Sequence, residues 1–331
     1  MPAGERERIL VIKHGALGDI VLATGPFKAV RANHPAAHIV LLTSAPYAKP
    51  LQKSGWFDEI WVDDRPKPWN LGQWWRLRRM LRDAGFVRVY DLQHTDRTGL
   101  YYRMMGQPRP EWSGIARGAS HPHANPERDS MHTIERQAEQ LAAAGIAETP
   151  PTDVSWMTAD LSRYLVSEPF ALLVPGGAKH RPKKRWPASR YAALANWFHG
   201  RGLQPVLIGA LQENAIMEEI EGRTRGTLNL CNDTSLAAIA ELGRRATIAV
   251  GNDTGPMHLI AAAGCPSVVL FSEASVPEQT APRGETVVVV QHERLPSLGI
   301  AAVLRAVYQA VPHLRPAAQD SDSSPAQTKA G

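Results

Sequence analysis

Residues 9–20 read Ile-Leu-Val-Ile-Lys-His-Gly-Ala-Leu-Gly-Asp-Ile, an apolar run that passes through two glycines into a second apolar stretch. The run at residues 9–12 predicts a short buried strand, and residues 17–33 predict a helix. The glycines lie in the turn between them, where a backbone without side chains can approach a ligand closely. This stretch predicts the first strand-turn-helix unit of a parallel sheet, although it lacks the G-x-G-x-x-G fingerprint of dinucleotide-binding proteins.

The same alternation of short apolar runs and amphipathic stretches recurs along the chain. Turn-rich sequence at residues 148–151 and 167–169 separates a first series from a second. We expect an α/β protein with two Rossmann-like, doubly wound parallel-sheet domains, residues 1–160 and 161–315, facing across a cleft, and a disordered tail at residues 316–331. A ligand should then lie at the carboxyl ends of the strands. The strands are expected at residues 9–12, 39–43, 87–92, 171–174, 206–208, 247–250 and 267–271.

The composition fits a two-domain protein of a reducing compartment. The 331 residues are 44% hydrophobic, which is enough for two packed cores. Cys231 and Cys265 have neither the spacing of a metal site nor the pattern of a disulfide framework. Residues 1–8 are polar and give no signal peptide or membrane span, so we expect a cytoplasmic protein. The net charge of +5 is compatible with phosphorylated ligands, nucleic acid or an anionic membrane alike.

Asp19 is the first candidate for a catalytic group. It lies near the predicted start of the first helix, where the helix dipole favours an ionised carboxylate that can accept a proton. Gly15 and Gly18 precede it and would let an acceptor substrate approach the backbone. The same position suits a carboxylate that only caps the helix, and the local sequence does not separate a general base from a cap.

A glycine pair and a run of cations follow the predicted strand at residues 171–174. Residues 175–187 read Pro-Gly-Gly-Ala-Lys-His-Arg-Pro-Lys-Lys-Arg-Trp-Pro, and a helix is expected from Ala188. Such a loop can hold a diphosphate and stabilise it as a leaving group, with Gly176 at close approach and Lys184 as a cation. A solvated basic loop would explain the charges, but it has no need of a large aromatic such as Trp186.

Residues 251–258 read Gly-Asn-Asp-Thr-Gly-Pro-Met-His and follow another predicted strand. Asp253 or Thr254 can cap the next helix, whose free amide groups would form an anion site beside Gly255. Capping explains both side chains without any ligand, and a single histidine such as His258 is commonly a core residue. The whole string is harder to explain by capping alone.

Glu213 follows the predicted strand at residues 206–208. An acid in this place can accept hydrogen bonds from ribose hydroxyls, as in other nucleotide-binding folds. It can equally be an ordinary acidic residue of the first turn of the next helix.

Together these motifs resemble those of the ADP-heptose:lipopolysaccharide heptosyltransferases of glycosyltransferase family 9. The resemblance extends over residues 9–282, and three stretches carry it in the family's order: residues 15–19, residues 175–176 with 184–187, and residues 251–258. It implies a GT-B fold whose C-terminal domain holds the nucleotide-sugar donor and whose N-terminal domain holds the acceptor. It also implies an inverting transfer of heptose from ADP-heptose to a lipopolysaccharide core acceptor of the Kdo/heptose–lipid A type, without a cofactor or a bound metal.

The resemblance assigns roles to the candidate residues. Asp19 matches the base that deprotonates the acceptor, and Lys184 matches the cation on the donor phosphates. Glu213 matches, more loosely, the acid that contacts the ribose. The residues that match the donor-binding segment are Asp253, Thr254, Gly255 and His258.

Metal independence agrees with the residues, because no D-x-D pair follows a strand and Asp63-Asp64 reads as a surface turn. Two positions depart from the family's pattern. Gly177-Ala178-Lys179 lacks the hydroxyl residue that often follows Pro-Gly, and Phe271-Ser272 replaces the usual Phe-Gly. The alternatives are a family 9 transferase for another NDP-sugar, a GT-B sugar-nucleotide epimerase or, more distantly, a nucleotide-binding protein without activity. We expect no nucleic-acid partner, because no nucleic-acid-binding motif is present.

Residues 69–82 predict an amphipathic helix rich in aromatic and basic residues. Leu71, Trp74, Leu77 and Leu81 would face a core. That would leave the arginines free to meet anionic lipid or a phosphorylated saccharide. An ordinary surface helix explains the pattern as well. The expected partners are thus a nucleotide-sugar donor, a lipid-linked saccharide acceptor and, as a candidate, the cytoplasmic face of the inner membrane.

Overall fold

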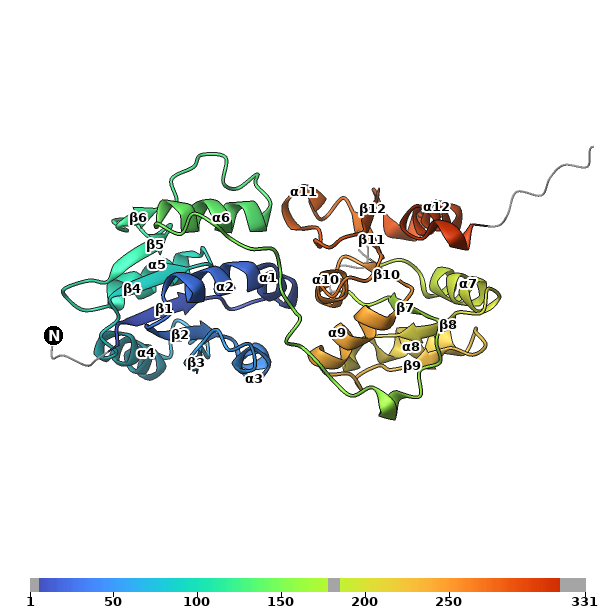
Figure 1. The fold of residues 1–331 in the computed structure, drawn as a ribbon, viewed down its shortest axis with the longest axis horizontal. Helices are drawn as coiled ribbons and strands as arrows, with labels where there is room; N and C mark the ends of the chain where they lie inside the picture. The colour runs from blue at the N-terminus through green and yellow to red at the C-terminus, as the bar shows by residue number, and fades with distance from the viewer. Residues whose placement is uncertain (1–5, 178–184, 316–331) are drawn as a thin grey trace, which may run out of the picture.

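The structure, a computed structural model, describes residues 6–177 and 185–315. Within these residues the strands form two six-stranded parallel sheets, each with helices on both faces (Figure 1). This confirms the predicted pair of doubly wound α/β domains. The predicted tail at residues 316–331 lies outside the described residues.

The first sheet has the strand order β3-β2-β1-β4-β5-β6. The chain builds outward from β1 through β2 and β3, then returns to place β4 on the other side of β1, with Ile12 in register with Asp91. The carboxyl ends of β1 and β4 therefore border the switch point of this sheet, which is where doubly wound folds bind ligands. The strands are β1 (Arg8–Ile12), β2 (His38–Thr43), β3 (Glu59–Val62), β4 (Arg88–Asp91), β5 (Glu111–Gly114) and β6 (His121–Pro122).

Alternate residues of β1 pack into two separate cores. Ile9 and Val11 pack against α1, α2 and α6, whereas Leu10 and Ile12 pack against α4 and α5. The helix predicted for residues 17–33 is two helices, because the chain breaks at Ala23 between α1 and α2. The helices of this domain are α1 (Leu17–Leu22), α2 (Thr24–Asn33), α3 (Ala45–Gln52), α4 (Leu71–Asp83), α5 (Asp96–Met104) and α6 (Thr133–Ala143).

Helix α4 corrects one detail of the sequence prediction. Leu77 and Leu81 are buried and Trp74 is half-buried, as expected, but Leu71 is exposed to solvent. At about 100° per residue, Leu71 lies about 120° around the helix axis from Leu77, and it shares the outer face with Trp75. The prediction that Leu71 faces the core was therefore wrong.

The second sheet repeats the plan, with the order β12-β11-β10-β7-β8-β9 and a switch point between β7 and β10. Every strand predicted from the sequence is present, whereas β3, β5, β6, β9 and β12 were not predicted. These five lie at or next to a sheet edge, where strands are short or half-exposed. The strands are β7 (Phe170–Val174), β8 (Gln204–Leu207), β9 (Leu228–Asn229), β10 (Ile248–Asn252), β11 (Ser267–Ser272) and β12 (Val287–His292).

Helices α7, α8 and α12 cover one face of the second sheet, and α9 and α10 cover the other. The helix expected from Ala188 begins there. The helices are α7 (Ala188–His199), α8 (Asn214–Glu221), α9 (Leu236–Arg245), α10 (Gly255–Ala262), α11 (Pro277–Thr280) and α12 (Ile300–Ala310).

The segment between α6 and β7 crosses from the first domain to the second. The Asp153 amide donates to Thr24 Oγ1 at 2.9 Å, and the Asp153 carboxylate pairs with Lys28 at 2.7 Å. A few residues later, Val154 and Met157 are buried in the core of the second domain. The connection is thus packed on both domains, and the division between residues 160 and 161 stays a prediction.

Gly25 and Gly99, both inside helices, give a test of this packing. A Cβ on Gly25 would lie 2.1 Å from the Pro150 carbonyl oxygen, whereas a Cβ on Gly99 would meet no atom within 4 Å. We expect Gly25→Ala to lower the free energy of unfolding by about 1–3 kcal/mol through overpacking. We expect Gly99→Ala to raise it by up to about 1 kcal/mol through helix propensity. Urea unfolding of both variants measures this. Equal stability of the two would contradict a tight contact between the connection and α2.

Candidate functional site

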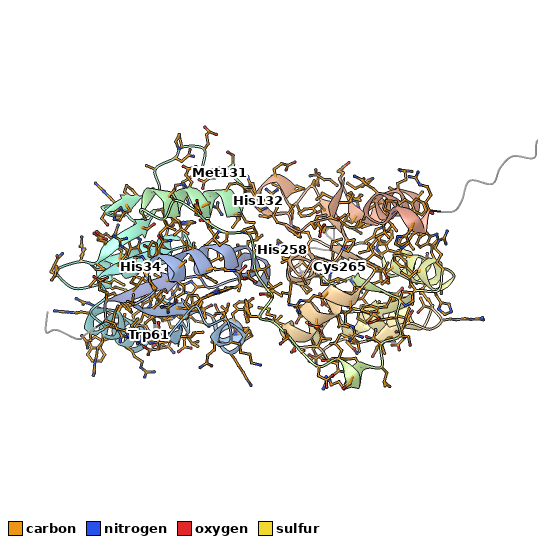
Figure 2. All side chains as sticks on the ribbon, in the orientation of Figure 1. His34, Trp61, Met131, His132, His258 and Cys265 are labelled. Carbon is orange, nitrogen blue, oxygen red and sulfur yellow. The ribbon has the colours of Figure 1, made fainter. Side chains whose placement is uncertain are left out.

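The switch points of the two sheets meet through the first turns of α1 and α10. A Cβ on Gly18 would lie 2.8 Å from His258 Cδ2, and a Cβ on Gly255 would lie 2.7 Å from Leu17 Cβ. Figure 2 shows His258 at the junction of the two domains. The turns that carry Asp19 and Asp253 are therefore neighbours, although more than 200 residues separate them along the chain.

A second contact joins the domains beside this junction. His132 Nε2 lies 2.9 Å from the carbonyl oxygen of Ala281, and Thr133 Oγ1 donates to the Gln279 carbonyl at 3.3 Å. Arg283 pairs with Glu135 at 2.9 Å. The amino end of α6 is thus attached to the segment that contains α11, which closes one side of the junction (Figures 1 and 2).

The Asp19 carboxylate is oriented by the first turn of its own helix. Its Oδ2 accepts a hydrogen bond from the Ala16 amide at 3.0 Å, and its Oδ1 lies 3.7 Å from Lys13 Nζ. The side chain is nevertheless 44% exposed. The two interpretations of Asp19 are therefore compatible, because a carboxylate bound to the helix start is still accessible to a substrate. On the same turn, Gly15 has φ +116°, and a Cβ there would lie 2.4 Å from the Tyr47 ring.

Lys13 was missed from the sequence because a lysine after a strand is ordinarily solvated. Here its ammonium is buried and donates to the Leu92 carbonyl at 3.1 Å. Burial lowers the pKa of Lys13, and attraction by Asp19 opposes that shift. Burial also raises the pKa of Asp91, at the end of β4, to about 6. Lys13 and Asp91, a buried cation and a buried acid, thus lie at the switch point, with Lys13 next to Asp19.

Arg136 adds positive charge near Asp19, and Arg128, which pairs with Asp129 at 3.3 Å, adds positive charge near Arg136. Arg136, on α6, is half-buried, and burial followed by repulsion from Arg128 lowers its pKa, while Asp19 acts in the opposite direction. Arg136 Nη2 donates to Thr133 Oγ1 over a long 3.4 Å. The Nε atoms of Arg136 and Arg128 are buried and have no hydrogen-bond partner within residues 6–177 and 185–315. Desolvated guanidinium groups with incomplete partners favour the binding of an anion.

A hollow of about 570 Å³ opens on the other side of the Asp19 turn. Asp63 forms part of its wall and is buried, so the prediction of a surface turn is correct only for Asp64. Asp63 lies 2.9 Å from His14 Nε2 and accepts from Tyr101 Oη at 2.5 Å. Burial acts to raise the pKa of Asp63, but the neighbouring His14 imidazole and the hydrogen bond from Tyr101 lower it. The hollow is lined by His14, Gly15, Ala16, Ser44, Ala45, Pro46, Tyr47, Val62, Asp63, Asp64 and Arg65.

Asn252 fixes both ends of the cationic loop of the second domain. Its Nδ2 donates to the carbonyls of Pro175 and Gly176 at 2.9 and 3.0 Å. Its Oδ1 accepts from the Trp186 amide at 3.2 Å and from Tyr191 Oη at 3.0 Å. Asn252 is fully buried, and no local pattern indicates this role because its partners are far away along the chain. Lys184 lies outside the described residues.

Trp186, at the end of that loop, is buried, and its Nε1 donates to the Leu298 carbonyl at 2.8 Å. The large aromatic therefore anchors the loop, as its occurrence in a basic run suggested. Next to it, Arg185 donates to the Gly177 carbonyl.

Glu213 is tied to the glycine pair. Its Oε1 accepts from the Gly177 amide at 2.7 Å, and its Oε2 accepts from the Ala210 amide at 2.8 Å. A Cβ on Gly176 would lie 2.0 Å from Glu213 Oε1, so a residue with a side chain would displace the carboxylate. Glu213 thus connects the loops that follow β7 and β8, which an ordinary first-turn acid would not do.

The start of α10 is not capped by the side chains that the sequence suggested. Thr254 occupies the cap position, but its hydroxyl donates to the Asn252 carbonyl at 3.2 Å. Asp253 accepts from Ser275 Oγ at 2.6 Å. Neither observation favours simple capping.

His258, one turn into α10, is buried at the junction. Burial lowers its pKa to about 4, so the ring is neutral at neutral pH. Its Nδ1 has no hydrogen-bond partner among the residues that the structure describes. His258 is therefore not the fully satisfied core histidine that its isolation in the sequence suggested.

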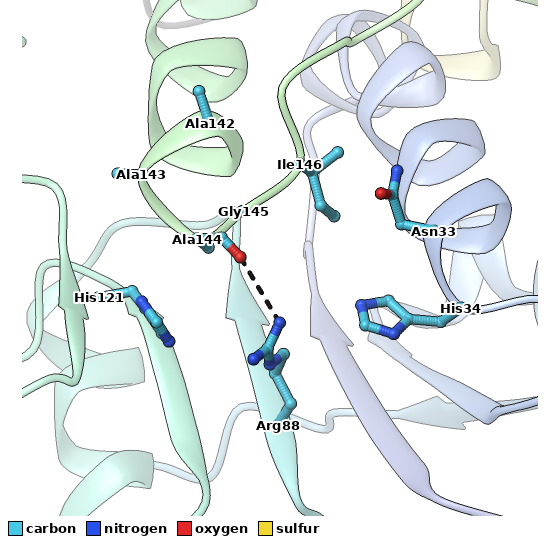
Figure 3. Close-up of a pocket in the computed structure, with 9 residues that line it drawn as sticks. All are labelled: Asn33, His34, Arg88, His121, Ala142, Ala143, Ala144, Gly145 and Ile146. Carbon is cyan, nitrogen blue, oxygen red and sulfur yellow. Dashed lines mark hydrogen bonds between the residues drawn. The ribbon is translucent and has the colours of Figure 1, made fainter.

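A hollow of about 620 Å³ lies at the opposite end of the first sheet (Figure 3). His34 and His121 line it together with Arg88, which begins β4 rather than ending it. Arg88 is already paired with Glu111 and donates to the Ala144 carbonyl at 3.5 Å. This hollow is remote from the switch point and has no free charge to offer a ligand. In the described parts of the chain, no three His, Cys, Asp or Glu side chains come together as a metal ligand set.

Comparison with known proteins identifies the family. The sequence model of glycosyltransferase family 9 (heptosyltransferase) matches residues 74–302. Lipopolysaccharide heptosyltransferase 2 of Escherichia coli K12 is 27% identical over 301 residues, which cover 83% of this chain and 85% of that protein.

Solved structures share the fold. The glycosyltransferase family 9 protein of Veillonella parvula DSM 2008 has a TM-score of 0.77 at 20% identity, covering 93% of this chain and 97% of that one. E. coli ADP-heptose lps heptosyltransferase II has a TM-score of 0.72 at 24% identity, covering 92% and 99%. These matches confirm the predicted GT-B architecture. With the family match covering most of both domains, the chain belongs to glycosyltransferase family 9, the heptosyltransferases, and is a glycosyltransferase.

Proposed function

We propose that this glycosyltransferase transfers a heptose from ADP-heptose to a lipopolysaccharide core acceptor of the Kdo/heptose–lipid A type, with inversion and without a metal cofactor. The observation that carries the proposal is the contact of α1 with α10. It puts an accessible carboxylate, Asp19, beside the amino end of a helix that follows the second switch point. A base and an anion site are the two components that such a transfer needs. The names of the relatives support the choice of substrates.

In this mechanism the Asp19 carboxylate takes the proton of the acceptor hydroxyl as its oxygen attacks the anomeric carbon. The bond between that carbon and the diphosphate oxygen breaks, and ADP leaves from the opposite face of the sugar. The hydrogen bond from the Ala16 amide holds one carboxylate oxygen in place, so the carboxylate needs little reorganisation during attack.

The donor diphosphate would lie between the glycine pair after β7 and the start of α10. The amide groups of the first turn of α10, from Gly255 onward, can donate to phosphate oxygens. Lys184 is proposed to neutralise the charge that develops on the leaving diphosphate. Glu213, at the end of the same loops, is placed to accept from a ribose hydroxyl if its bond to Gly177 opens. Asp253 and Thr254 would complete the donor site.

The acceptor would lie over the first domain, around Gly15, Gly18 and Asp19. The incompletely partnered guanidinium groups of Arg128 and Arg136 match an acceptor that carries carboxylates or phosphates. We propose that the enzyme works in the cytoplasm, with a peripheral position on the inner membrane where the lipid-linked acceptor is found.

Nucleotide binding tests the donor. We expect ADP to stabilise the protein against heat at lower concentrations than UDP or GDP do. We also expect ADP release from ADP-heptose to require a lipopolysaccharide core acceptor. A preference for UDP or GDP would replace ADP-heptose by another NDP-sugar, and loss of the donor without an acceptor product would favour epimerase or hydrolase chemistry.

Asp19→Asn tests the base. The amide can still accept from Ala16 but cannot take a proton, so kcat should fall by roughly two to four orders of magnitude while ADP binding stays close to that of the wild type. Asp83→Asn, which changes an exposed carboxylate at the end of α4, serves as the control and should leave kcat unchanged. A kcat for Asp19→Asn within a factor of three of the wild type would remove Asp19 from the mechanism.

Arg136→Ala tests the acceptor site. Loss of a charge-assisted contact should raise KM for a phosphorylated or carboxylated acceptor by about tenfold to a hundredfold and leave KM for the donor unchanged. Arg305→Ala, at an exposed position of α12, is the matched control. An equal rise in both KM values would indicate that Arg136 supports the fold of the junction instead of the acceptor.

A further inference from the structure

The amino-terminal end of α4 exposes large apolar side chains. Trp69, Leu71 and Trp75 are 76%, 76% and 62% exposed, whereas Leu77 and Leu81 of the same helix are buried. Leu71 and Trp75 are one turn apart and share a face, and Trp69 directly precedes the helix. Exposed aliphatic residues are common singly, but two exposed tryptophans beside a leucine form a patch that water solvates poorly.

Positive charge surrounds this patch. Residues 64–83 contain six Lys or Arg and two Asp, a net charge of +4, against +5 for the whole chain. Lys67 Nζ lies 5.4 Å from the centre of the Trp69 ring, and Arg79 Cζ lies 5.7 Å from that of Trp75. Arg76, Arg78 and Arg82 are exposed on the same helix.

Amphipathic aromatics surrounded by cations fit an anionic lipid surface. Indole rings occupy the interfacial region of a bilayer, and arginines on the same helix can reach the phosphates. Cations close to an anionic leaflet are attracted to its surface. The centre of a protein interface is instead depleted of charged residues. In the described residues, no helix is long and apolar enough to cross a membrane.

The patch is connected to the acceptor side of the site. Trp74 Nε1 donates to the Lys67 carbonyl at 3.1 Å, and Arg97 Nη2 donates to the Pro66 carbonyl at 3.1 Å. Two residues before Lys67, Arg65 Nη2 donates to Ser44 Oγ at 2.8 Å in the wall of the hollow beside Asp19. The loop that carries Trp69 is therefore held by α4 and α5 at one end and forms part of the wall of the hollow beside the Asp19 turn at the other.

We propose that Trp69, Leu71 and Trp75 insert into the interfacial region of an anionic bilayer, and that the cations of residues 64–83 contact its phosphates. This docking turns the hollow beside the Asp19 turn toward the membrane. The orienting effect rests on the proposed function, since it assumes a lipid-linked acceptor, but bilayer binding does not.

Vesicle binding tests the docking surface in the full chain. The probe is cosedimentation with phosphatidylcholine vesicles that contain phosphatidylglycerol, compared with phosphatidylcholine alone. The test variant combines Trp69→Ser, Leu71→Ser and Trp75→Ser. The control combines Leu165→Ser and Leu211→Ser, which change residues that are 82% and 67% exposed on the second domain. Both variants should unfold at the wild-type temperature, because they alter exposed side chains.

We expect the wild type and the control to bind the anionic vesicles and the triple variant to bind at least tenfold more weakly. Binding of the wild type should weaken as salt is raised. Wild-type binding by the triple variant, or no binding by the wild type at low salt, would overturn the proposal. So would a patch that only joins two copies of the chain, seen in sedimentation velocity as a dimer that the triple substitution dissociates without any change in vesicle binding.

Activity separates orientation from catalysis. With the acceptor embedded in vesicles, the triple variant should lose at least tenfold in rate relative to the wild type, and with a deacylated, water-soluble acceptor it should match the wild type. Equal loss on both acceptors would overturn the orienting role. If the wild type transfers heptose to neither acceptor, the proposed function fails, while the vesicle experiment still decides the docking surface.

Discussion

Two helices that start from different sheets, α1 and α10, touch at their first turns, and the relative position of the domains depends on that contact. Each helix contributes a glycine where the other approaches: Gly18 faces His258, and Gly255 faces Leu17. Val21, one turn further along α1, is buried in the core of the second domain. Helix starts carry partial positive charge, which favours the ionised Asp19 carboxylate at the start of α1. Burial that keeps His258 neutral avoids adding a further positive charge there.

The two domains contribute different kinds of side chain to the site. In the second domain, the Asn252 and Glu213 side chains hold the loops after β7 and β8 through bonds to backbone carbonyl and amide groups. In the first domain, charged side chains predominate, with Lys13 and Arg136 desolvated around Asp19. Burying cations without full partners is costly for folding. The anionic acceptor proposed above would supply the missing negative charge.

Much of this arrangement could be predicted from local sequence. Each feature that was not predicted has its own physical reason. The central strands are continuous apolar runs, and the glycine strings after them predict the turns at Asp19, Gly176 and Asp253. The strands at or next to the sheet edges were not predicted because they are short or half-exposed, as in β12. The role of Asn252, the burial of Asp63 and the exposure of Leu71 depend on groups far away in the chain or on the angle of a helix. Local sequence contains no information about the distant partners of Asn252 and Asp63, whereas the exposure of Leu71 follows from its helical spacing to Leu77.

Because the two domains would bind different substrates, donor and acceptor specificity could change separately. Backbone amides can bind a diphosphate whatever sugar it carries. The departures from the family's pattern at residues 177–179 and 272 lie in this second domain, where a change of donor would be expected to act. The first domain recognises its ligand through side chains that single substitutions can replace. The cations around Asp19, and the charged loop that leads from Arg65 to α4, can therefore vary with the charge and the lipid attachment of the acceptor. The contacts of α1 with α10, Gly18 with His258 and Gly255 with Leu17, lie outside both of these recognition surfaces and keep Asp19 beside the donor side.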